Sequence, residues 1–383
     1  MKIIHICLCG PFTDGFNYQE NLISKYHVKL GYDVVLLASK WIWDENGKLS
    51  ITNRTDYINE DGVHIVRLPM KFGDINTKFK LYSGLYFAID REQPNIIFVH
   101  GVQFLDIFQI IRYKKKNPGT KVFIDNHADF SNSATSWASR NILHKGLWRF
   151  CAKRAEPYVT RFYGVLPARV DFLINLYHIS PSKCKLLVMG ADDDLVEKVL
   201  DPLETRNFRK IYNINENDFL IVTGGKIDIW KTQTLLLMKA INNIQKQDLK
   251  LIIFGSIAEN IRSEFNALLN DNKIQYIGWL NSKSSYLAFA ASDLVVFPGR
   301  HSVYWEQAAG EGIPLIVKDW PGTHHIDLGG NVKFLKHDCV NEIQENIQLL
   351  IDNQKVYKAM KEIAKERGKT YFSYKDIAKR SIE

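Results

Sequence analysis

The chain has 383 residues, of which 46% are hydrophobic and 24% are charged, and this balance is typical of a soluble globular protein with two domains. No apolar run reaches the length of about eighteen residues that a membrane-spanning helix needs, so the sequence predicts no such helix. The net charge of +8 favours an anionic partner, which could be a nucleotide diphosphate, a phosphorylated lipid, an acidic membrane or nucleic acid.

The first residues, MKIIHICLCGPF, contain one lysine and a short apolar run without a small-residue cleavage site. They predict a first core strand and not a signal peptide. The 5 cysteines are scattered, with no CxxC pair and no Cys/His cluster at zinc spacing. This usage favours a reducing cytoplasm and no structural metal.

In the first half of the chain, short apolar runs alternate with helical stretches, which indicates a parallel sheet covered on both faces. A flexible loop with Gly10 and Gly15 follows the first run, and a helix is expected from about Asn17 to Gly31. The glycine spacing does not match the dinucleotide fingerprint, which argues against NAD. The expected strands are 3–8, 33–38, 63–68, 95–99, 121–125, 162–166 and 185–188.

The second half repeats this alternation, and two such halves predict an α/β fold with two Rossmann-like domains facing a central cleft. We expect an acceptor-binding domain over 1–200, a nucleotide-sugar-binding domain over 201–365, and a helix over 366–383 that crosses back to the first domain. The expected strands are 219–224, 250–254, 275–277, 294–297, 315–317 and 332–335.

Two basic stretches in the first half contain aromatic and apolar residues, at 110–121 and 140–154. In the second stretch the apolar residues follow helical spacing beside cationic ones. This pattern fits an interfacial helix that meets anionic lipid headgroups at the inner face of a membrane. It also fits an ordinary surface helix whose apolar stripe faces the core.

The loop after the first strand of the second half reads GGKIDIWKTQTLL. Lys226 and Lys231 are five residues apart at a strand-to-helix turn, and Gly224 and Gly225 permit close backbone approach. Two ammonium groups that converge on one point suit a diphosphate, because each charge-assisted hydrogen bond contributes about 1.5–3 kcal/mol. Alternatively, both lysines are solvated.

The stretch 293–317 reads as a buried strand, a Pro-Gly turn, a polar loop, a helix with Glu306 in its first turns, and a second strand. Such a unit places loop amides and a helix start at the carboxyl edge of a parallel sheet, where phosphorylated ligands bind. The Glu306 carboxylate could reach ligand hydroxyls, or it could simply complement the helix dipole.

A cluster of polar residues is expected at the carboxyl end of strand 121–125. Asp125, His127 and Asp129 alternate there, and His100 ends the preceding strand. Alternate residues of an extended segment share a face, so a metal site is conceivable, but no fourth ligand is evident. His127 is better suited to donate a hydrogen bond to a sugar hydroxyl or a phosphate oxygen.

Taken together, these features resemble the GT-B retaining glycosyltransferases of the large group 1 or family 4 type, which serve bacterial polysaccharide and glycolipid assembly. The resemblance spans nearly the whole length. Its carriers are YQENLISKYHVKLGYDVVLLAS (18–39), IDNHADFSNSA (124–134), VLPARVDFL and VMGAD (165–192), GGKIDIWK (224–231) and FPGRHSVYWEQAAGEGIPLIV (297–317).

The resemblance implies a role for each matching residue. Lys226 and Lys231 would hold the donor diphosphate as catalytic residues, and His127 would meet the donor sugar. Donor contacts would also come from Gly10, Gly225, Trp279 and Leu280 near the base, His301, Ser302 and Val303 at the distal phosphate, and Glu306 at the ribose. Asp125, Asp129, His100 and Arg300 would be further sugar or acceptor contacts.

The chain departs from the family at Pro298, where such enzymes usually carry a glutamate eight residues before the ribose-binding one. The resemblance implies a retaining hexosyltransferase that moves a sugar from a nucleotide-diphosphate donor, such as a UDP-sugar, to a glycan or polyprenyl-diphosphate-linked acceptor. It implies no metal and no other cofactor, and we see no nucleic-acid-binding module. The alternatives are a sugar-nucleotide epimerase or phosphorylase on the same fold, and a catalytically silent nucleotide-sugar-binding subunit.

Overall fold

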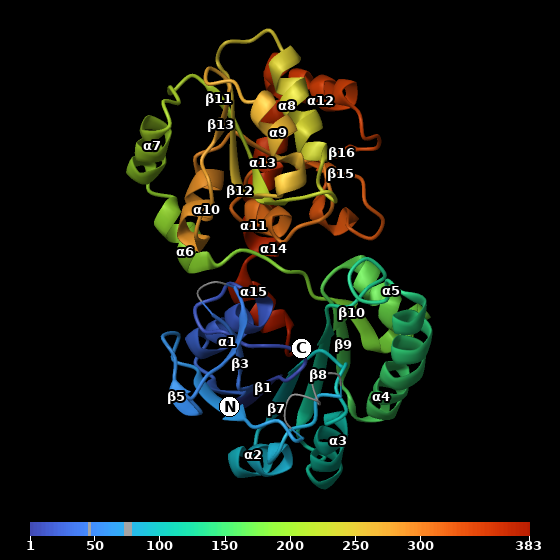
Figure 1. The fold of residues 1–383 in the computed structure, drawn as a ribbon. Coiled ribbons are helices and arrows are strands. Elements are labelled where there is room, and N and C mark those ends of the chain that lie inside the picture. Colours follow the sequence, from blue (N-terminus) through green and yellow to red (C-terminus); the bar gives the residue numbers. More distant parts are fainter. Residues whose placement is uncertain (45–46, 73–78) are drawn as a thin grey trace. The chain divides into compact units, whose positions relative to one another are not determined.

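The chain folds into two compact units, seen in a computed structural model that describes residues 1–44, 47–72 and 79–383. Unit 1 comprises Met1–Val188 and Ile377–Glu383, and unit 2 comprises Met189–Asp376 (Figure 1). The sequence placed the domain boundary at 200/201, whereas the compact units meet at 188/189. The last helix, α15 (Tyr374–Arg380), begins in unit 2 and ends in unit 1.

Unit 1 is built on an eight-stranded sheet in the order β10-β9-β8-β7-β1-β2-β6-β5. All neighbouring strands are parallel except β5, which runs antiparallel to β6. All seven strands expected from the first half are confirmed. The strands are β1 Lys2–Cys7, β2 Asp33–Ser39, β5 Asp56–Ile58, β6 His64–Leu68, β7 Ile96–His100, β8 Lys121–Asn126, β9 Arg161–Gly164 and β10 Cys184–Leu186.

Three short strands of unit 1 were not expected. They are β5 and the antiparallel pair β3 (Trp41–Trp43) and β4 (Leu49–Ile51). Each has three residues, and the end residues of β4 and β5 are exposed. These strands therefore lack the apolar run that marks a buried strand in the sequence.

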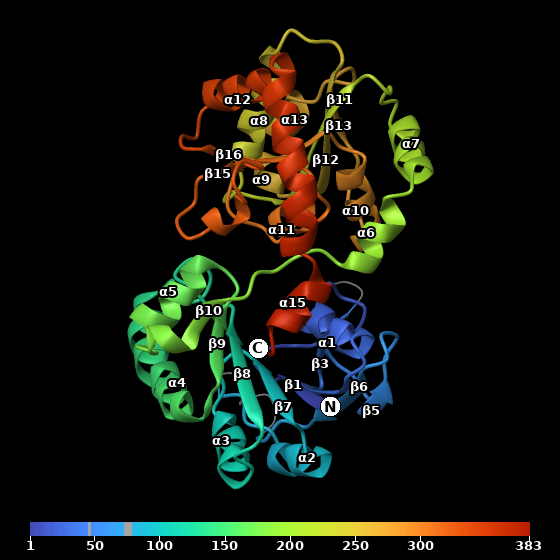
Figure 2. The same cartoon turned by 180° about the vertical axis from the view of Figure 1, so that it is seen from behind.

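Helices cover both faces of the unit 1 sheet (Figures 1 and 2). On one face, Ile4 and Ile6 of β1 pack into a cluster with residues of α2, α3 and α5. On the other, Cys7 packs with partly buried Val28 of α1. The helices are α1 Gln19–Lys29, α2 Leu85–Glu92, α3 Ile107–Lys116, the π-helix η2 Ser139–Trp148 with α4 Arg149–Ala155, and α5 Pro167–Asn175.

Unit 2 contains a six-stranded parallel sheet in the order β13-β12-β11-β14-β15-β16, and its six strands confirm those expected. The strands are β11 Phe219–Ile227, β12 Leu249–Ile257, β13 Ile274–Tyr276, β14 Leu294–Phe297, β15 Leu315–Lys318 and β16 Val332–Leu335. The helices include α6 Asp193–Val199, α7 Pro202–Ile211, α8 Gln233–Asn243, α9 Glu259–Ala267, α10 Ser282–Ala290, α11 Tyr304–Gly310, α12 Val340–Asp352 and α13 Gln354–Ile363.

Each sheet has a point where the chain reverses its direction of travel across the strands. In unit 1 this point lies between β1 and β7, and in unit 2 it lies between β11 and β14. In open parallel sheets, ligands bind outside the carboxyl ends of the strands at such a switch point. Two candidate edges therefore follow from the topology.

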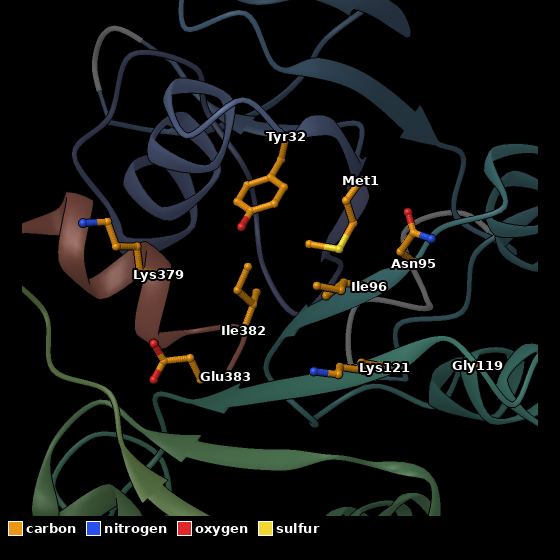
Figure 3. Close-up of a pocket in the computed structure, with 9 residues that line it drawn as sticks. All are labelled: Met1, Tyr32, Asn95, Ile96, Gly119, Lys121, Lys379, Ile382 and Glu383. Atoms are coloured by element: carbon orange, nitrogen blue, oxygen red, sulfur yellow. The ribbon is translucent and has the colours of Figure 1, made fainter.

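The last segment of the chain, Ile377–Glu383, belongs to unit 1 and lies at the opposite edge of its sheet, near the starts of β1, β7 and β8. Figure 3 shows Ile382 and Glu383 beside a cavity of about 550 Å³ that Tyr32 and Ile96 also line. In the described part of the chain, no helix is both long enough and apolar enough to cross a membrane.

Candidate functional site

Two glycines bring strand β11 close to its neighbours at the switch point of unit 2. Gly225 pairs with Gly255 of β12, and a Cβ added to Gly255 would stand 1.9 Å from the Gly225 carbonyl oxygen. Gly225 itself has φ +107°, and a Cβ there would lie 3.4 Å from the Tyr304 ring and 3.9 Å from Lys231 Nζ. At Gly225, therefore, no side chain of β11 covers the backbone where the loop from β11 to α8 and the start of α11 come together.

The two predicted diphosphate lysines lie in different environments, Lys226 near the end of β11 and Lys231 in the loop that follows it. The Lys226 side chain is 76% exposed, with Nζ 3.8 Å from the Asp228 carboxylate. Lys231 is partly buried, and burial lowers the pKa of its ammonium while nearby Asp228 raises it. Its backbone packs against the loop after β14, where a Cβ on Gly299 would lie 3.6 Å from Lys231 Cα. Lys231 is thus held in place, whereas Lys226 extends into solvent.

A third cation lies beside Lys231. The Arg300 guanidinium stands 5.2 Å from the centre of the Trp230 ring and 5.7 Å from that of Trp320, and its charge lowers the pKa of Lys231. Sequence reasoning listed Arg300 only as a sugar or acceptor contact and did not single out Trp230 or Trp320. The WK pair at 230–231 was the available signal, because an exposed indole next to a cation suits stacking.

Glu306 lies in the first turn of α11 and is 0% exposed. His301 Nε2 donates to its Oε1 at 2.8 Å and His325 Nε2 donates to the same oxygen at 2.9 Å. Burial alone would raise the pKa of this carboxyl, but the two imidazoles outweigh it and lower the pKa to about 2. Among the described residues, Oε2 is buried without a hydrogen-bond partner, so one oxygen of the carboxylate remains to be satisfied.

His325 was not expected in this site, because it lies 19 residues after Glu306. The expected phosphate-binding residues His301, Ser302 and Val303 do form the loop and start of α11, where the Ser302 carbonyl accepts from Trp305 N at 2.9 Å. The His301 ring, however, is turned toward Glu306. Only its remaining nitrogen and the loop amides can face a ligand.

The predicted base-binding residues follow β13, the strand at the far end of this sheet. Gly278 has φ +76°, and its carbonyl accepts from Gly255 N at 2.8 Å. Trp279 is exposed, and Leu280 is partly buried. Gly255 thus links this turn to the bare part of β11.

The carboxyl edge of unit 1 gathers three of the predicted residues around a second, smaller cavity of about 180 Å³. Gly10, His100 and His127 all line it, and a Cβ on Gly10 would meet nothing within 4 Å. Gln103 and Glu20 also line this cavity and were not predicted. They come from the loop after β7 and from α1, so the fold alone brings them to this edge.

Asp125 lies beneath this cavity and is fully buried. Its Oδ2 accepts from His100 Nδ1 at 2.9 Å and lies 3.4 Å from His127 Nε2, and its Oδ1 accepts from Gly101 N at 3.0 Å. Despite burial, His127 and His100 hold the pKa of Asp125 far below its usual range. Burial also acts against a charged His127, but Asp125 outweighs it and raises the pKa of His127.

Asp129 differs from Asp125, because its carboxylate is already satisfied within its own turn. Oδ1 accepts from Ser131 N at 2.7 Å and Asn132 N at 3.1 Å, and Oδ2 accepts from Arg169 Nε at 3.1 Å. Asp129 therefore shapes the loop after β8, and a sugar contact would have to displace one of these donors.

A comparison with protein families indicates what kind of domain contains Lys226, Lys231 and α11. Residues 204–367, which include Lys226, Lys231 and Glu306, match the family described as Glycosyl transferases group 1. Most of unit 2 is therefore similar to the group 1 glycosyltransferases. No curated protein is similar enough in sequence to match the chain.

Solved structures have a fold similar to that of the whole chain. A glycosyltransferase from Rickettsia africae has a TM-score of 0.68 at 13% identity, covering 99% of this chain and 96% of that chain. HepE from Anabaena, solved in complex with UDP, has a TM-score of 0.68 at 13% identity, covering 99% and 98%. A UDP-GlcNAc 2-epimerase from Neisseria meningitidis has a TM-score of 0.63 at 14% identity, covering 99% and 98%.

At these identities the solved structures show the fold. The chain has the GT-B fold, and the resemblance to GT-B glycosyltransferases stated from the sequence is confirmed, whereas the family 4 type and the retention of configuration remain predictions. The roles of the individual site residues remain predictions.

Proposed function

We propose that the chain transfers a hexosyl group from a UDP-linked donor to a glycan or polyprenyl-diphosphate-linked acceptor, with retention of anomeric configuration, in cell-surface polysaccharide synthesis. The support is chemical and comparative. HepE, which shares the fold, was solved with UDP and with UDP-glucose. The family match covers the unit that contains the predicted donor-binding residues.

The observation that carries the proposal is the convergence of Lys231, Gly225 and the loop of Gly299 at the switch point of unit 2. A backbone that no side chain covers at Gly225, and an ammonium group of Lys231 whose loop is packed in place, suit the binding of a diphosphate. Breaking the bond between sugar and phosphate leaves negative charge on the diphosphate, so a cation fixed at that point stabilises the transition state more than the ground state.

Lys226, Lys231 and Arg300 are the charges that we assign to the leaving diphosphate, without a metal ion or other cofactor. The departing phosphate oxygen would accept the proton of the acceptor hydroxyl. Glu306 Oε2 would accept a hydrogen bond from the ribose, and Trp279 with Leu280 would lie against the base. His127, Gly10 and His100 of unit 1 would contact the donor sugar or the phosphates.

Thermal shift of the full chain with a panel of nucleotide sugars tests the donor assignment, because a ligand that binds only the folded state raises the melting temperature. UDP-sugars are expected to raise it, with free UDP as the reference. Lys231→Ala should abolish the shift, whereas Lys239→Ala on α8, whose ammonium pairs with Glu264, should retain it. A panel with no stabilising nucleotide sugar would contradict the proposal.

An epimerase is the second candidate, because a UDP-GlcNAc 2-epimerase shares the fold over 99% of this chain. Incubation with the donor alone distinguishes the two, since only an epimerase gives a new sugar nucleotide without an acceptor. Dependence of product formation on added phosphate would indicate a phosphorylase. Donor binding without any turnover would indicate a silent subunit, which the proline at 298 would then explain.

We further propose that unit 1 contacts an anionic membrane surface through the stretches 110–121 and 140–154. Ile142 is 59% exposed and Phe150 is 49% exposed, so the apolar stripe of the second stretch is not all in the core. Lys114, Lys115 and Lys116 fill the last turn of α3. Ile142→Asp is expected to weaken sedimentation with anionic vesicles and leave the low binding to neutral vesicles unchanged; equal binding by both proteins would refute the contact.

A further inference from the structure

Three buried histidines of unit 1 form a continuous chain of hydrogen bonds that starts at Asp125. Asp125 Oδ2 contacts His100 Nδ1 at 2.9 Å, His100 Nε2 contacts His5 Nδ1 at 3.0 Å, and His5 Nε2 contacts His27 Nδ1 at 2.9 Å. The far nitrogen, His27 Nε2, lies 2.9 Å from the Ala378 carbonyl oxygen. We call these four side chains the histidine relay; it runs from the site edge of the sheet to the last segment of the chain.

The four contacts of the histidine relay need one hydrogen more than its three rings supply when all of them are neutral. It contains four contacts, and each needs one hydrogen. Three neutral imidazoles carry only three N–H groups, and both ends of the relay, the carboxylate and the carbonyl, are acceptors. Asp125 also accepts from Gly101 N, as an ionised carboxylate does. If the rings supply the fourth hydrogen themselves, one of them is an imidazolium.

A neutral arrangement exists, but it costs contacts in the last segment. Ser381 Oγ lies 3.2 Å from His27 Nε2 and 2.7 Å from the Ala378 carbonyl oxygen. If its single hydrogen turned to His27, every ring could be neutral, but the Ala378 carbonyl would then lose both donors and face a nitrogen lone pair. The shorter distance to Ala378 favours the charged arrangement.

The surroundings indicate which ring carries the charge. Burial lowers the pKa of His5, and it lowers the pKa of His27 to about 4. Burial therefore disfavours the charge on His5 and on His27, and His100 is the ring of the relay whose Nδ1 faces the Asp125 carboxylate. The other titratable groups around the relay include Cys7 on β1, Cys9 after β1, Glu20 on α1, Tyr32 after α1, His127 after β8 and Arg169 on α5.

We propose that His5 and His27 are positioning residues, which share one proton with His100 so that the same relay anchors segment 377–383 and fixes the Asp125 carboxylate beside His127. With the proton, His100 donates to Asp125 through Nδ1, and each of the other three contacts of the relay donates toward Ala378. Without it, the donors reverse, Ser381 turns, and the anchor on the last segment is lost. Only the consequence for His127 rests on the proposed function; the shared proton and the anchor do not.

Nuclear magnetic resonance of the full chain labelled with ¹⁵N-histidine reads the proton directly. At neutral pH we expect the signals of one imidazolium from the relay, assigned by loss of the signals in single-histidine variants. Two neutral rings with the hydrogen on Nε2 should accompany it, as the direction of donation requires. Three neutral rings with the hydrogen on Nδ1 would overturn the proposal.

Amide hydrogen exchange of segment 377–383, corrected for the intrinsic effect of pH, measures how firmly the relay holds this segment. Protection should fall about tenfold or more when the relay loses its proton. His5→Phe keeps the ring volume but breaks the relay, so protection should no longer depend on pH. The matched control is His144→Phe, because His144 is also buried in unit 1 but bonds Tyr177 outside the relay, and it should keep the dependence.

Ser381→Ala keeps the proposal testable even if His5→Phe fails to fold. Without the hydroxyl, the neutral arrangement has no donor for His27, so the midpoint of the change in protection should move to higher pH. A midpoint at the wild-type pH, with protection merely lower, would show that Ser381 is only structural and would overturn the proposal. If the imidazolium signal and the pH-dependent protection are both observed but the protein has no transfer activity, only the proposed function is wrong.

Discussion

His325 Nε2 donates a hydrogen bond to Glu306 Oε1 at 2.9 Å, joining the loop after β15 to the first turn of α11. His301 donates to the same oxygen from the other side. A carboxylate that holds two imidazoles through one oxygen is fixed in orientation, and its second oxygen is buried and unpartnered among the described residues. Glu306 thus has a structural role, and its unpartnered oxygen is the atom that the proposed ribose contact would use.

Glu306→Gln tests both roles. The amide should raise the donor KM with little change in kcat, since a ribose contact serves the ground state and transition state alike. It should also lower the free energy of unfolding by about 1–3 kcal/mol, because two charge-assisted hydrogen bonds become neutral. Steady-state kinetics and urea unfolding measure these effects, with Glu345→Gln on exposed α12 as the control. An unchanged donor KM would remove the ribose assignment.

Lys231→Ala should reduce turnover by roughly 10²–10³, the usual effect of losing one donor aimed at developing negative charge. The structure sharpens the comparison with Lys226. Because Lys231 is held by the loop around it and Lys226 is largely exposed, we expect the smaller loss from Lys226→Ala. Initial rates at saturating donor give the comparison, and activity of Lys231→Ala within about threefold of wild type would refute its role.

The glycines separate folding from function. Gly225→Ala should destabilise the chain by about 1–3 kcal/mol, since φ +107° is strained for any residue with a Cβ. A Cβ at Gly10 meets nothing within 4 Å, so the free energy of unfolding of Gly10→Ala should lie within about 0.5 kcal/mol of that of wild type. If the loop after β1 approaches the donor, Gly10→Ala should still raise the donor KM. Thermal unfolding and kinetics on the same samples test both statements, and a normal KM would place Gly10 outside the site.

The stability of the chain should rise with pH between about 4 and 6.5. His27 has a pKa of about 4 when folded, against an ordinary value of 6.5, so the unfolded chain binds more protons across this window. The free energy of unfolding should therefore fall by about 3 kcal/mol for this residue as pH falls from 6.5 to 4. His5, whose pKa burial also lowers, adds to the same trend.

Denaturant unfolding at several pH values measures this slope. His27→Gln keeps a donor for the Ala378 carbonyl but cannot titrate, so its slope should be shallower than that of wild type. Equal slopes for wild type and His27→Gln would contradict the prediction.

The sequence was most informative where burial repeats along the chain. Near-continuous apolar runs such as that of β1 belong to strands buried on both faces, and every expected strand is present. The lysine loop and α11 were also expected at a sheet edge, because strand, glycine turn and helix follow one another directly. Short half-exposed strands such as β4 carry no comparable pattern and were missed.

Contacts that depend on distant parts of the chain were not predicted. His325 approaches Glu306 only because β15 lies beside β14, and a histidine at 325 has no local signal for that. His5 of β1 and His27 of α1 were likewise overlooked, since a single buried histidine in a strand or a helix is ordinary by itself. Their alignment requires β1, β7 and α1 to be placed first, and strand order does not follow from periodicity.

Arg300 stands between the rings of Trp230 and Trp320 at the edge where the donor is proposed to bind. If a bound phosphate attracts the Arg300 guanidinium, its distance from the Trp230 and Trp320 rings would change. The protein therefore has tryptophan fluorophores at the proposed donor site. Binding of an unlabelled nucleotide can be followed by titration through the tryptophan fluorescence emission. Trp230→Phe and Trp320→Phe would then tell which ring reports the event.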